Sequence, residues 1–421
     1  MTFTKRRTNN KGGIYLRFDC IIVGGGAAGM MAAVTAAESG KKTALFEKND
    51  RLGKKLRITG KGRCNVTNYC DTDELMKNIP VNNRFMYSSF SGFTPYDVMD
   101  FFESSGVPLK VERGNRVFPV SDRAADIVSA LENRVKKAGV KIIHEKVTGI
   151  IVDDGVCCGV KTEKSEYSSV SVLIATGGAS YPLTGSTGDG YEFARSTGHT
   201  VTDIVPSLVP LEIKEDFCGE LSGLTLKNIS LSLFDREKKV YSELGEMMFA
   251  YFGVTGPLVL TASSRIRKME TGRYVISLDL KPGLSEEKLD KRLQRDFSEM
   301  SGLEFRNVLV KLLPSKLIPV TVKLSGIPGE LKAGQISKVQ RAELVKLLKN
   351  FRMTVTDFRP VEEAIVTSGG VSVKEINPKT MESKIVSGLF FAGEVIDVDG
   401  YTGGFNLQIA FSTGYAAGIN L

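Results

Sequence analysis

The sequence predicts an α/β fold: a parallel sheet with flanking helices, interrupted by a β-rich subdomain with a helical cap. Three observations predict it. Residues 20–49 read as strand, glycine-rich turn, helix and strand. Strand-like apolar runs return at 170–175 and 389–392, each followed by glycines. Between these runs, residues 197–350 show short β-type runs and then helical spacing.

Length and composition indicate a globular protein of several domains. The chain has 421 residues, of which 42% are hydrophobic and 25% charged. We expect a basic, disordered extension at 1–17. A discontinuous domain should cover 18–196 and 351–421, with a β-rich insertion at 197–280 and a helical cap at 281–350. No apolar run reaches the ~18 residues of a membrane span, and the first one ends in glycines rather than a cleavage site. We therefore expect a cytoplasmic protein.

The positive charge is unevenly distributed. Of a formal net charge of +8, five cations and no acid fall within residues 1–17. Residues 281–350 carry 14 Lys and Arg against 8 Asp and Glu. We interpret the second segment as a solvated helix face, with contact to an anionic substrate or nicotinamide dinucleotide as the alternative. No basic motif is interleaved with aromatic residues, so the sequence argues against nucleic acid as a partner.

A glycine motif near the N-terminus predicts a dinucleotide site. Gly24, Gly26 and Gly29 satisfy G-x-G-x-x-G between a strand and a helix of small residues. Such glycines permit the turn, the approach of a pyrophosphate and close packing of helix on strand. Glu47 ends the next strand, 18 residues beyond Gly29, where an acid binds ribose hydroxyls. An acid there repels a 2′-phosphate, so the Rossmann-like motif favours FAD or NAD over NADP.

Two later segments resemble parts of the two-dinucleotide-binding flavoproteins. Residues 388–418 look like their C-terminal element, in which Glu394 would bind the ribityl or pyrophosphate region and the last helix points at the flavin. The run 170–178 resembles their second pass along the cofactor, with Thr176 and Gly177 beside it. Val147 would offer backbone groups to adenine. Three segments on one cofactor fit FAD, whereas NAD needs only the first.

Over most of its length the chain is similar to the BaiN-like (bile-acid-inducible N) flavoproteins, also labelled aminoacetone-oxidase-like. The motifs that carry the resemblance are GKKLRITGKGRCNVTN at 53–68, ATGGASYPLTGSTGDGY at 175–191, TSGGV at 367–371 and GLFFAGEVIDVDGYTGGFNLQIAFSTG at 388–414. The resemblance implies that residues 53–68 wrap over FAD, where Lys54, Arg57 and Arg63 balance charge. Further cofactor contacts that it implies are Ala27, Ala28, Lys48, Gly62, Cys64, Asn65, Gly178, Gly393, Asp397, Gly404, Asn406 and Gln408.

The cysteines do not point to thiol or metal chemistry. Six cysteines contain no C-x-x-C pair, and the chain has two histidines, so no metal site is predicted. Cys64 and Cys70 are separated by five residues, unlike the four of flavin disulfide reductases. We expect Cys64 to pack beside the cofactor as a small hydrophobic residue. The thiol-redox enzyme is the weaker reading.

The protein residues of catalysis are not identified by the sequence. A proton donor near the flavin would suit Tyr181, Tyr251 or Tyr401, each of which lies near a motif. His199 is expected to pack or cap, and His144 to lie on a strand surface.

The leading hypothesis is a cytoplasmic FAD oxidoreductase of bile-acid, steroid or other lipid metabolism. It would use NAD(P)H to reduce a conjugated C=C in a small steroid-like enone such as a 3-dehydro-bile acid. The insert holds no second G-x-G-x-x-G, so the nicotinamide must dock in another way. One alternative is an FAD-dependent aminoacetone-type oxidase that produces peroxide. Another is a flavin-bound, non-enzymatic or RNA-associated protein. The substrate, the nicotinamide and the oligomeric state stay open.

Overall fold

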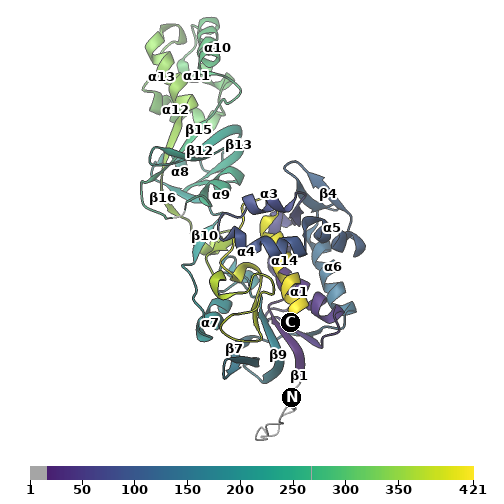
Figure 1. Cartoon of the computed structure of the whole chain (residues 1–421). Helices are drawn as coiled ribbons and strands as arrows, with labels where there is room; N and C mark the ends of the chain where they lie inside the picture. Colours follow the sequence, from purple (N-terminus) through teal and green to yellow (C-terminus); the bar gives the residue numbers. More distant parts are fainter. Residues whose placement is uncertain (1–16, 267) are drawn as a thin grey trace, which may run out of the picture. The chain divides into compact units, whose positions relative to one another are not determined.

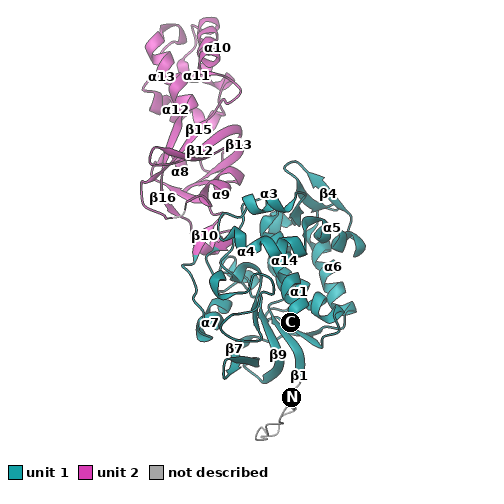
Figure 2. Cartoon of the chain, viewed as in Figure 1, with its two compact units in different colours: residues 1–204, 368–421 teal, residues 205–367 magenta. Residues whose placement is uncertain are grey.

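The computed structural model describes residues 17–266 and 268–421, which form two compact units (Figure 2). Unit 1 comprises the residues up to 204 together with 368–421, and unit 2 comprises 205–367. The expected second boundary, at 351, differs because residues 351–358 form a strand of unit 2. The expected extension at 1–17 lies outside the described residues except for Arg17, which begins the first strand. Among the described residues no helix is long and apolar enough to cross a membrane.

Unit 1 is built on a mostly parallel seven-stranded sheet (Figure 1). Its parallel strands run in the order β6-β2-β1-β9-β18, and β7 and β8 add an antiparallel extension to β9. The strands are β1 (Arg17–Val23), β2 (Thr43–Phe46), β6 (Lys141–Ile143), β7 (Val147–Asp153), β8 (Val156–Thr162), β9 (Glu166–Ile174) and β18 (Leu389–Phe391). β1 and β2 are buried apolar runs, as strands covered on both faces require.

A second, three-stranded sheet and several helices complete unit 1. The small sheet consists of β3 (Thr67–Asn68), β5 (Arg116–Pro119) and β4 (Leu109–Glu112), in that order. The helices are α1 (Ala27–Glu38), α2 (Lys54–Ile58), α3 (Thr72–Lys77), α4 (Asn83–Gly92), α5 (Pro95–Ser104), α6 (Ala124–Lys137), α7 (Asp189–Ser196) and α14 (Phe405–Asn420).

The first and last helices pack directly on one another (Figure 1). α1 is buried along Ala28–Ala36 and carries no charge before its last residue. A Cβ added at Gly414 of α14 would lie 2.4 Å from the Ala28 oxygen, and one at Gly418 2.8 Å from the Ala32 oxygen. The two backbones therefore approach closely only because these positions are glycine.

Unit 2 is a closed β-barrel with helices. Around the barrel the strands are β11 (Leu211–Ile213), β14 (Gly253–Thr255), β13 (Lys238–Ala250), β12 (Thr225–Asp235), β15 (Tyr274–Asp279) and β16 (Phe351–Phe358). A separate pair is formed by β10 (Val205–Ser207) and β17 (Val366–Ser368). The helices are α8 (Phe217–Glu220), α9 (Pro257–Ser263), α10 (Glu286–Glu299), α11 (Phe305–Val308), α12 (Ile318–Ser325) and α13 (Lys338–Lys349).

Each unit has its own hydrophobic core. In the helical part of unit 2, Ser285 caps α10, and a capping box of Ser337 and Gln340 begins α13. Both helices lie in the segment for which the sequence predicts a helical cap, 281–350. The predicted fold is confirmed: a Rossmann-like sheet with flanking helices, interrupted by a β-rich unit that carries helices.

Candidate cofactor site

Three segments distant in sequence meet at the carboxyl ends of the parallel strands. In the sheet register Val23 pairs with Ile174, and Ile174 pairs with Phe391. The chain leaves these ends together, because Ala175 N donates to Val23 O (2.9 Å) and Ala392 N to Ile174 O (3.1 Å). In open α/β sheets, ligands bind in the crevice outside these strand ends. The structure thus brings together the three predicted segments.

The glycine motif adopts the geometry that its spacing predicts. Gly24 has φ +109°, and a Cβ there would lie 2.4 Å from the Ala175 oxygen. A Cβ at Gly29 would lie 1.8 Å from the Gly24 oxygen. α1 can therefore pack against the turn only because residue 29 is glycine. A Cβ at Gly26 would meet no atom within 4 Å. Open space therefore lies at the glycine expected to face a pyrophosphate, and Ala27 and Ala28 begin the helix beside it.

Glu47 is held at the end of β2 beside the glycine turn. Its Oε2 accepts a hydrogen bond from Gly25 N (2.9 Å). Its Oε1 accepts from Asn49 N (2.8 Å) and Asn49 Nδ2 (2.7 Å). The side chain is buried, and the three donors fix the carboxylate in one orientation. A carboxylate has about four acceptor positions, so one stays available for a ribose hydroxyl.

The four predicted cations form ion pairs with nearby carboxylates. Lys48 pairs with Asp189 (2.7 Å) and Lys54 with Asp50 (2.8 Å). Arg57 pairs with Glu132 (3.3 Å).

Arg63 contacts both Glu112 and Asp122, and its guanidinium lies 4.2 Å from the centre of the Phe118 ring. Hydrogen bonds from Arg63 lower the pKa of Glu112 below its ordinary value. In this structure Arg63 therefore fastens its loop to the β4–β5 hairpin.

Lys55, which our sequence reasoning passed over, links two of the converging segments. Its Nζ lies 2.7 and 3.0 Å from the two carboxylate oxygens of Glu394 and 2.8 Å from Ser180 Oγ. Ser180 follows β9 and is fully buried, and Glu394 follows β18. The motif quoted for the resemblance contains Lys55. The start of the short helix α2 determines the direction of each side chain, and this would have distinguished Lys55 from Lys54.

The glycine loop before α14 lies against β3. Thr67 Oγ1 donates to Gln408 Oε1 (2.5 Å), and Asn68 Nδ2 donates to Gly403 O (3.0 Å). Gly404 has φ +102°, and a Cβ there would lie 2.4 Å from the Thr67 carbonyl. The predicted residues Gln408 and Gly404 are thus brought beside the loop that contains Cys64 and Asn65.

The remaining predicted residues of the two later segments are fixed by backbone contacts. Gly393 N donates to Thr413 Oγ1 (2.9 Å), and Asn406 Oδ1 accepts from Gly400 N (2.8 Å). Asp397 accepts from Asn82 Nδ2 (3.1 Å). Val147 is buried at the start of β7. Left-handed backbone occurs at Gly62, Gly177 and Gly393, and Gly178 O accepts from Gly188 N (3.1 Å).

Five of the six described thiols are buried, and burial raises the pKa of each of these five. Burial raises the pKa of Cys64 to about 12, and it does the same for Cys70. All described cysteines are free, and Cys64 is fully buried with φ +60°. A thiol of this pKa is a poor nucleophile. Among the described residues no cluster of His, Cys, Asp and Glu has the arrangement of a metal site.

The chemistry of the crevice fits FAD. Thr176 Oγ1 and Asn65 Oδ1 are buried oxygens without a hydrogen-bond partner in the described structure. The N-terminal residues of α1 and α14 follow glycines, Gly26 and Gly404, so no side chain caps these helices. Their free N–H groups and partial positive charge suit an anionic pyrophosphate and an electron-rich flavin edge.

The proton-donor candidates lie in different places. Tyr181 has φ +53° and lies in the loop after β9, and Tyr401 is buried in the loop after β18. Tyr251 belongs to unit 2 and is largely exposed. Tyr181 and Tyr401 therefore belong to the same unit as the glycine-rich segments, and Tyr251 belongs to the other.

His199 is a packed residue, as expected. It is buried, contacts Thr197 Oγ1 (3.0 Å) and Ser383 Oγ (2.7 Å), and meets the Phe391 ring edge-on. Burial lowers its pKa below the ordinary histidine value, although the nearby charge of Glu375 opposes this. His144 is exposed, and its Nδ1 lies 2.7 Å from Asn49 O.

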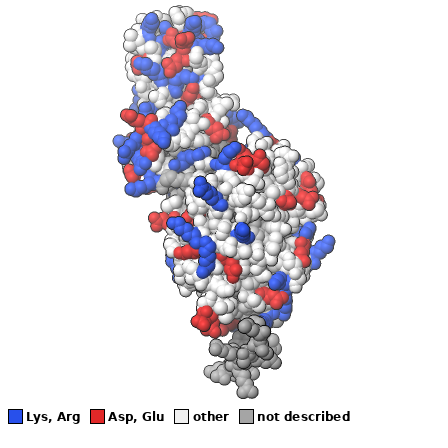
Figure 3. Space-filling model, in the orientation of Figure 1, with Lys and Arg blue, Asp and Glu red and all other residues white. Residues whose placement is uncertain are grey.

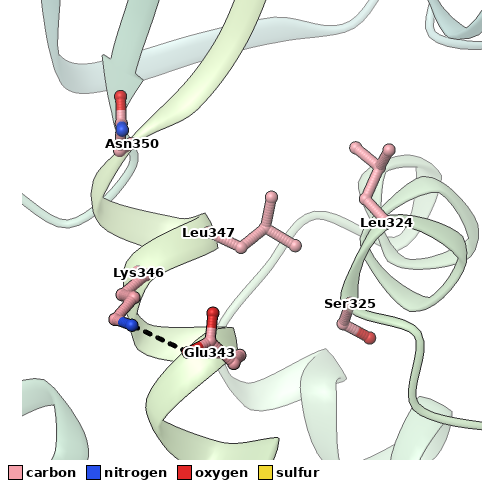
Figure 4. A pocket seen from close by; sticks show the side chains of 6 residues that line it. All are labelled: Leu324, Ser325, Glu343, Lys346, Leu347 and Asn350. Carbon is pink, nitrogen blue, oxygen red and sulfur yellow. Dashed lines mark hydrogen bonds and ion pairs between the residues drawn. The ribbon is translucent and has the colours of Figure 1, made fainter.

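An open pocket of about 370 Å³ occurs in unit 2, between α12 and α13 (Figure 4). Its lining residues are Leu324, Ser325, Glu343, Lys346, Leu347 and Asn350. Two of the lining residues, Lys346 and Glu343, lie on α13 and form an ion pair (2.7 Å). None of the predicted site residues lines the pocket.

Comparison with known families identifies the family of the chain. The model described as "HI0933-like protein Rossmann domain" matches residues 18–420. The chain belongs to this family. The match includes residues of both units.

Two known proteins are similar to the chain over nearly their whole length. The 3-dehydro-bile acid delta(4,6)-reductase of Clostridium scindens is 31% identical over 94% of this chain and 97% of its own. The ribosomal RNA dihydrouridine synthase of Haemophilus influenzae is 32% identical over 95% of this chain and 98% of its own. The first similarity confirms the predicted BaiN-like membership.

The solved structures support the fold alone. A quinol-fumarate reductase with menaquinol molecules superposes with a TM-score of 0.52 at 19% identity. The superposition covers 96% of this chain and 70% of that one. At this identity the likeness is one of architecture.

Proposed function

We propose that the protein is an FAD-dependent oxidoreductase that reduces a C=C bond conjugated to a carbonyl group. The observation that carries the proposal is the convergence of three glycine-rich segments at the ends of β1, β9 and β18. The two unpartnered oxygens of Thr176 and Asn65 support a cofactor with both donors and acceptors.

Each part of the crevice has a role toward FAD. The open N-terminus of α1 at Gly26 would hold the pyrophosphate, and Glu47 the adenosine ribose. Val147 would offer backbone groups to adenine, and the N-terminus of α14 would stabilise charge at the flavin edge. When bound, FAD supplies hydride transfer.

The protein's own residues then hold the geometry and the protons. Gln408, tied to Thr67 and to Phe93 O (2.9 Å), fixes the loop over the crevice and keeps bulk water from it. The proton for the carbon next to the carbonyl would come from Tyr181 or Tyr401, the two tyrosines in the loops after β9 and β18.

The names of both relatives suggest the same type of bond. A 3-dehydro-bile acid with unsaturation at carbons 4 and 6 has its double bonds conjugated to the 3-oxo group. The C5=C6 bond of uridine, which is saturated in dihydrouridine, is conjugated to the C4 carbonyl. In each, a hydride goes to the far carbon and a proton to the near one.

We rank a uridine in RNA first and a steroid enone second. The Haemophilus influenzae relative is named for ribosomal RNA, and a formal net charge of +8, of which +5 falls within residues 1–17, suits a polyanion. This order departs from our expectation from sequence, which argued against nucleic acid. The similarity to the Clostridium scindens enzyme keeps the 3-oxo steroid as the second candidate.

Anaerobic flavin reduction tests the proposal. Purified protein should be yellow, and NADH or NADPH should bleach its visible band. Reoxidation is then followed with unmodified ribosomal RNA, with a 3-oxo-4,6-diene steroid, and with oxygen plus an aminoketone. Reoxidation by RNA with formation of dihydrouridine supports the first substrate, and reoxidation by the steroid supports the second. A protein that binds no flavin, or whose flavin neither nicotinamide reduces, contradicts the proposal. Aminoketone-driven peroxide formation would select the oxidase.

A further inference from the structure

Charge alone does not define where RNA would bind on this protein. On the face drawn in Figure 3, Lys and Arg side chains are interspersed with Asp and Glu, with no single large basic field. Recognition of a single strand therefore needs a local site that combines aromatic rings with cations. Unit 1 has such a combination next to the cofactor crevice.

Two exposed tyrosines form a ring pair on unit 1. Tyr69 is 44% and Tyr96 50% exposed, and their ring centres lie 5.3 Å apart at an interplanar angle of 78°. Tyr69 directly follows β3, and Tyr96 lies in the first turn of α5. A capping box of Thr94 and Asp97 fixes that turn, with Pro95 at its first position. The pair is held by rigid elements and leaves ring surface open to solvent.

The tyrosine pair is directly connected to the crevice. Asn68, the residue before Tyr69, donates through Nδ2 to Gly403 O (3.0 Å) in the glycine loop before α14. The same group donates to Gly114 O (3.0 Å) in the β4–β5 turn. Asn68 thus connects the exposed residue Tyr69 to the loop that precedes α14.

Two arginines, Arg113 and Arg116, stand at the β4–β5 turn whose backbone contacts Tyr69. Tyr69 N donates to Asn115 O (2.7 Å), and Arg113 and Arg116 flank this turn. Arg116 Nε donates to Arg113 O (3.1 Å), and both side chains are exposed. In the described part of the chain neither guanidinium has an ion-pair partner.

Three acids near this surface along the chain are engaged, whereas Asp73 and Asp100 are exposed. Asp71 caps α3 by accepting from Glu74 N (2.8 Å), and Glu74 pairs with Lys77 (3.2 Å). Glu112 is bound by Arg63. None of the three engaged acids pairs with Arg113 or Arg116, and the Arg116 guanidinium lies 5.8 Å from the centre of the Phe118 ring.

We propose that Tyr69, Tyr96, Arg113 and Arg116 form a docking surface for single-stranded RNA, with the target base delivered to the adjacent crevice. This inference rests on the proposed reduction of uridine. Bases stack on tyrosine rings without sequence preference, and arginines hold the phosphates between them. A steroid has no phosphate for the arginines, so the surface favours RNA as the substrate class.

Binding of a fluorescein-labelled oligouridine to the full-length, flavin-loaded protein tests the surface by anisotropy. Tyr69→Ala and Tyr96→Ala should each weaken binding about tenfold, in line with the loss of one stacked base. The matched control is Tyr87→Ala on α4, which is 60% exposed and should bind as the wild type does. Arg113→Gln and Arg116→Gln should each flatten the dependence of log affinity on log salt by about 0.7. Arg84→Gln on α4 is their control.

Each variant is first checked for wild-type flavin content and melting temperature, so that misfolding is not read as lost docking. Wild-type affinity in both tyrosine variants would overturn the inference while leaving the proposed reduction intact. Failure of the wild-type protein to bind oligouridine would also overturn it. Flavin bleaching by NAD(P)H in the same preparations reports separately on the proposed function.

Discussion

Lys55 Nζ contacts both carboxylate oxygens of Glu394, at 2.7 and 3.0 Å, across 339 positions of sequence. The neighbouring Lys54 instead pairs with Asp50, whose side chain is 71% exposed. Two adjacent lysines of one short helix thus have different tasks. Lys55 links the segment after the glycine motif to the segment after β18, and Lys54 forms an ion pair with an exposed side chain at the surface.

Lys55→Met should weaken FAD binding by about tenfold, or about 1.4 kcal/mol. The substitution leaves the partly buried carboxylate of Glu394 uncompensated next to an anionic cofactor. Titration of apoprotein with FAD, followed by flavin fluorescence, measures the effect. Lys54→Met should bind as the wild type does, and Lys55→Met with Glu394→Gln should recover part of the loss. Equal losses in the two lysine variants would contradict the assignment.

Gly414→Ala and Gly92→Ala should change stability in opposite directions. Alanine at Gly414 puts a Cβ 2.4 Å from the Ala28 oxygen, so α1 and α14 must move apart, at a cost of about 1–3 kcal/mol. Gly92 ends α4 with no atom within 4 Å of a Cβ, and alanine there should stabilise by about 0.4–1 kcal/mol. Urea denaturation of both variants checks the signs. A stable Gly414→Ala protein would refute the close helix contact.

Cys64 should resist alkylation in the native protein. Burial raises the pKa of its thiol to about 12, so almost no thiolate forms at pH 8. Iodoacetamide labelling and mass spectrometry should find Cys158, which is partly exposed, modified before Cys64. Cys64→Ala should retain flavin reduction by NAD(P)H. Loss of that reduction, with flavin still bound, would restore the thiol-redox reading.

The stability of unit 1 should fall as pH drops through the range set by His199. Burial lowers the pKa of His199 in the folded state. Below the unfolded-state pKa of about 6.5, the unfolded chain therefore binds more protons than the folded protein does. Stability is therefore full above about pH 6.5 and declines below it. His199→Gln should flatten the decline measured by urea denaturation between about pH 5 and 6.5. His144→Gln, at the exposed histidine, is the matched control variant.

Much of unit 1 was predictable because its signals are local. The glycine turn, the charge-free helix after it and the run 170–175 each follow from residues within one element. The strand at 389–392 and the start of the last helix near 405 were found for the same reason. Glu47 and Thr176 follow β2 and β9 at neighbouring strand ends, because the order of parallel strands fixes which strand ends meet; their contact with a cofactor stays a prediction.

What failed was long-range or depended on side-chain direction. β13 was not predicted, and β16 was assigned to the cofactor domain, because a barrel strand is identified by its partners, which lie more than 100 positions away for β11 and β16. Lys55 was passed over for Lys54, since the direction of two adjacent side chains depends on where a five-residue helix begins. The ion pairs of Arg63 with Glu112 and Asp122 were not predicted, because these carboxylates belong to a separate element; its contact with the cofactor stays a prediction.

The close packing of α1 against α14 has a consequence for synthesis on the ribosome. α1 emerges from the ribosome long before α14, the helix that covers it, although almost every side chain of α1 is suited to burial. The intervening barrel is one continuous segment of the chain and can fold first, whereas the sheet of unit 1 is incomplete until β18 has been made. A nascent chain that stalls before residue 389 therefore exposes an uncovered apolar helix, and we expect such fragments to be held by chaperones or degraded.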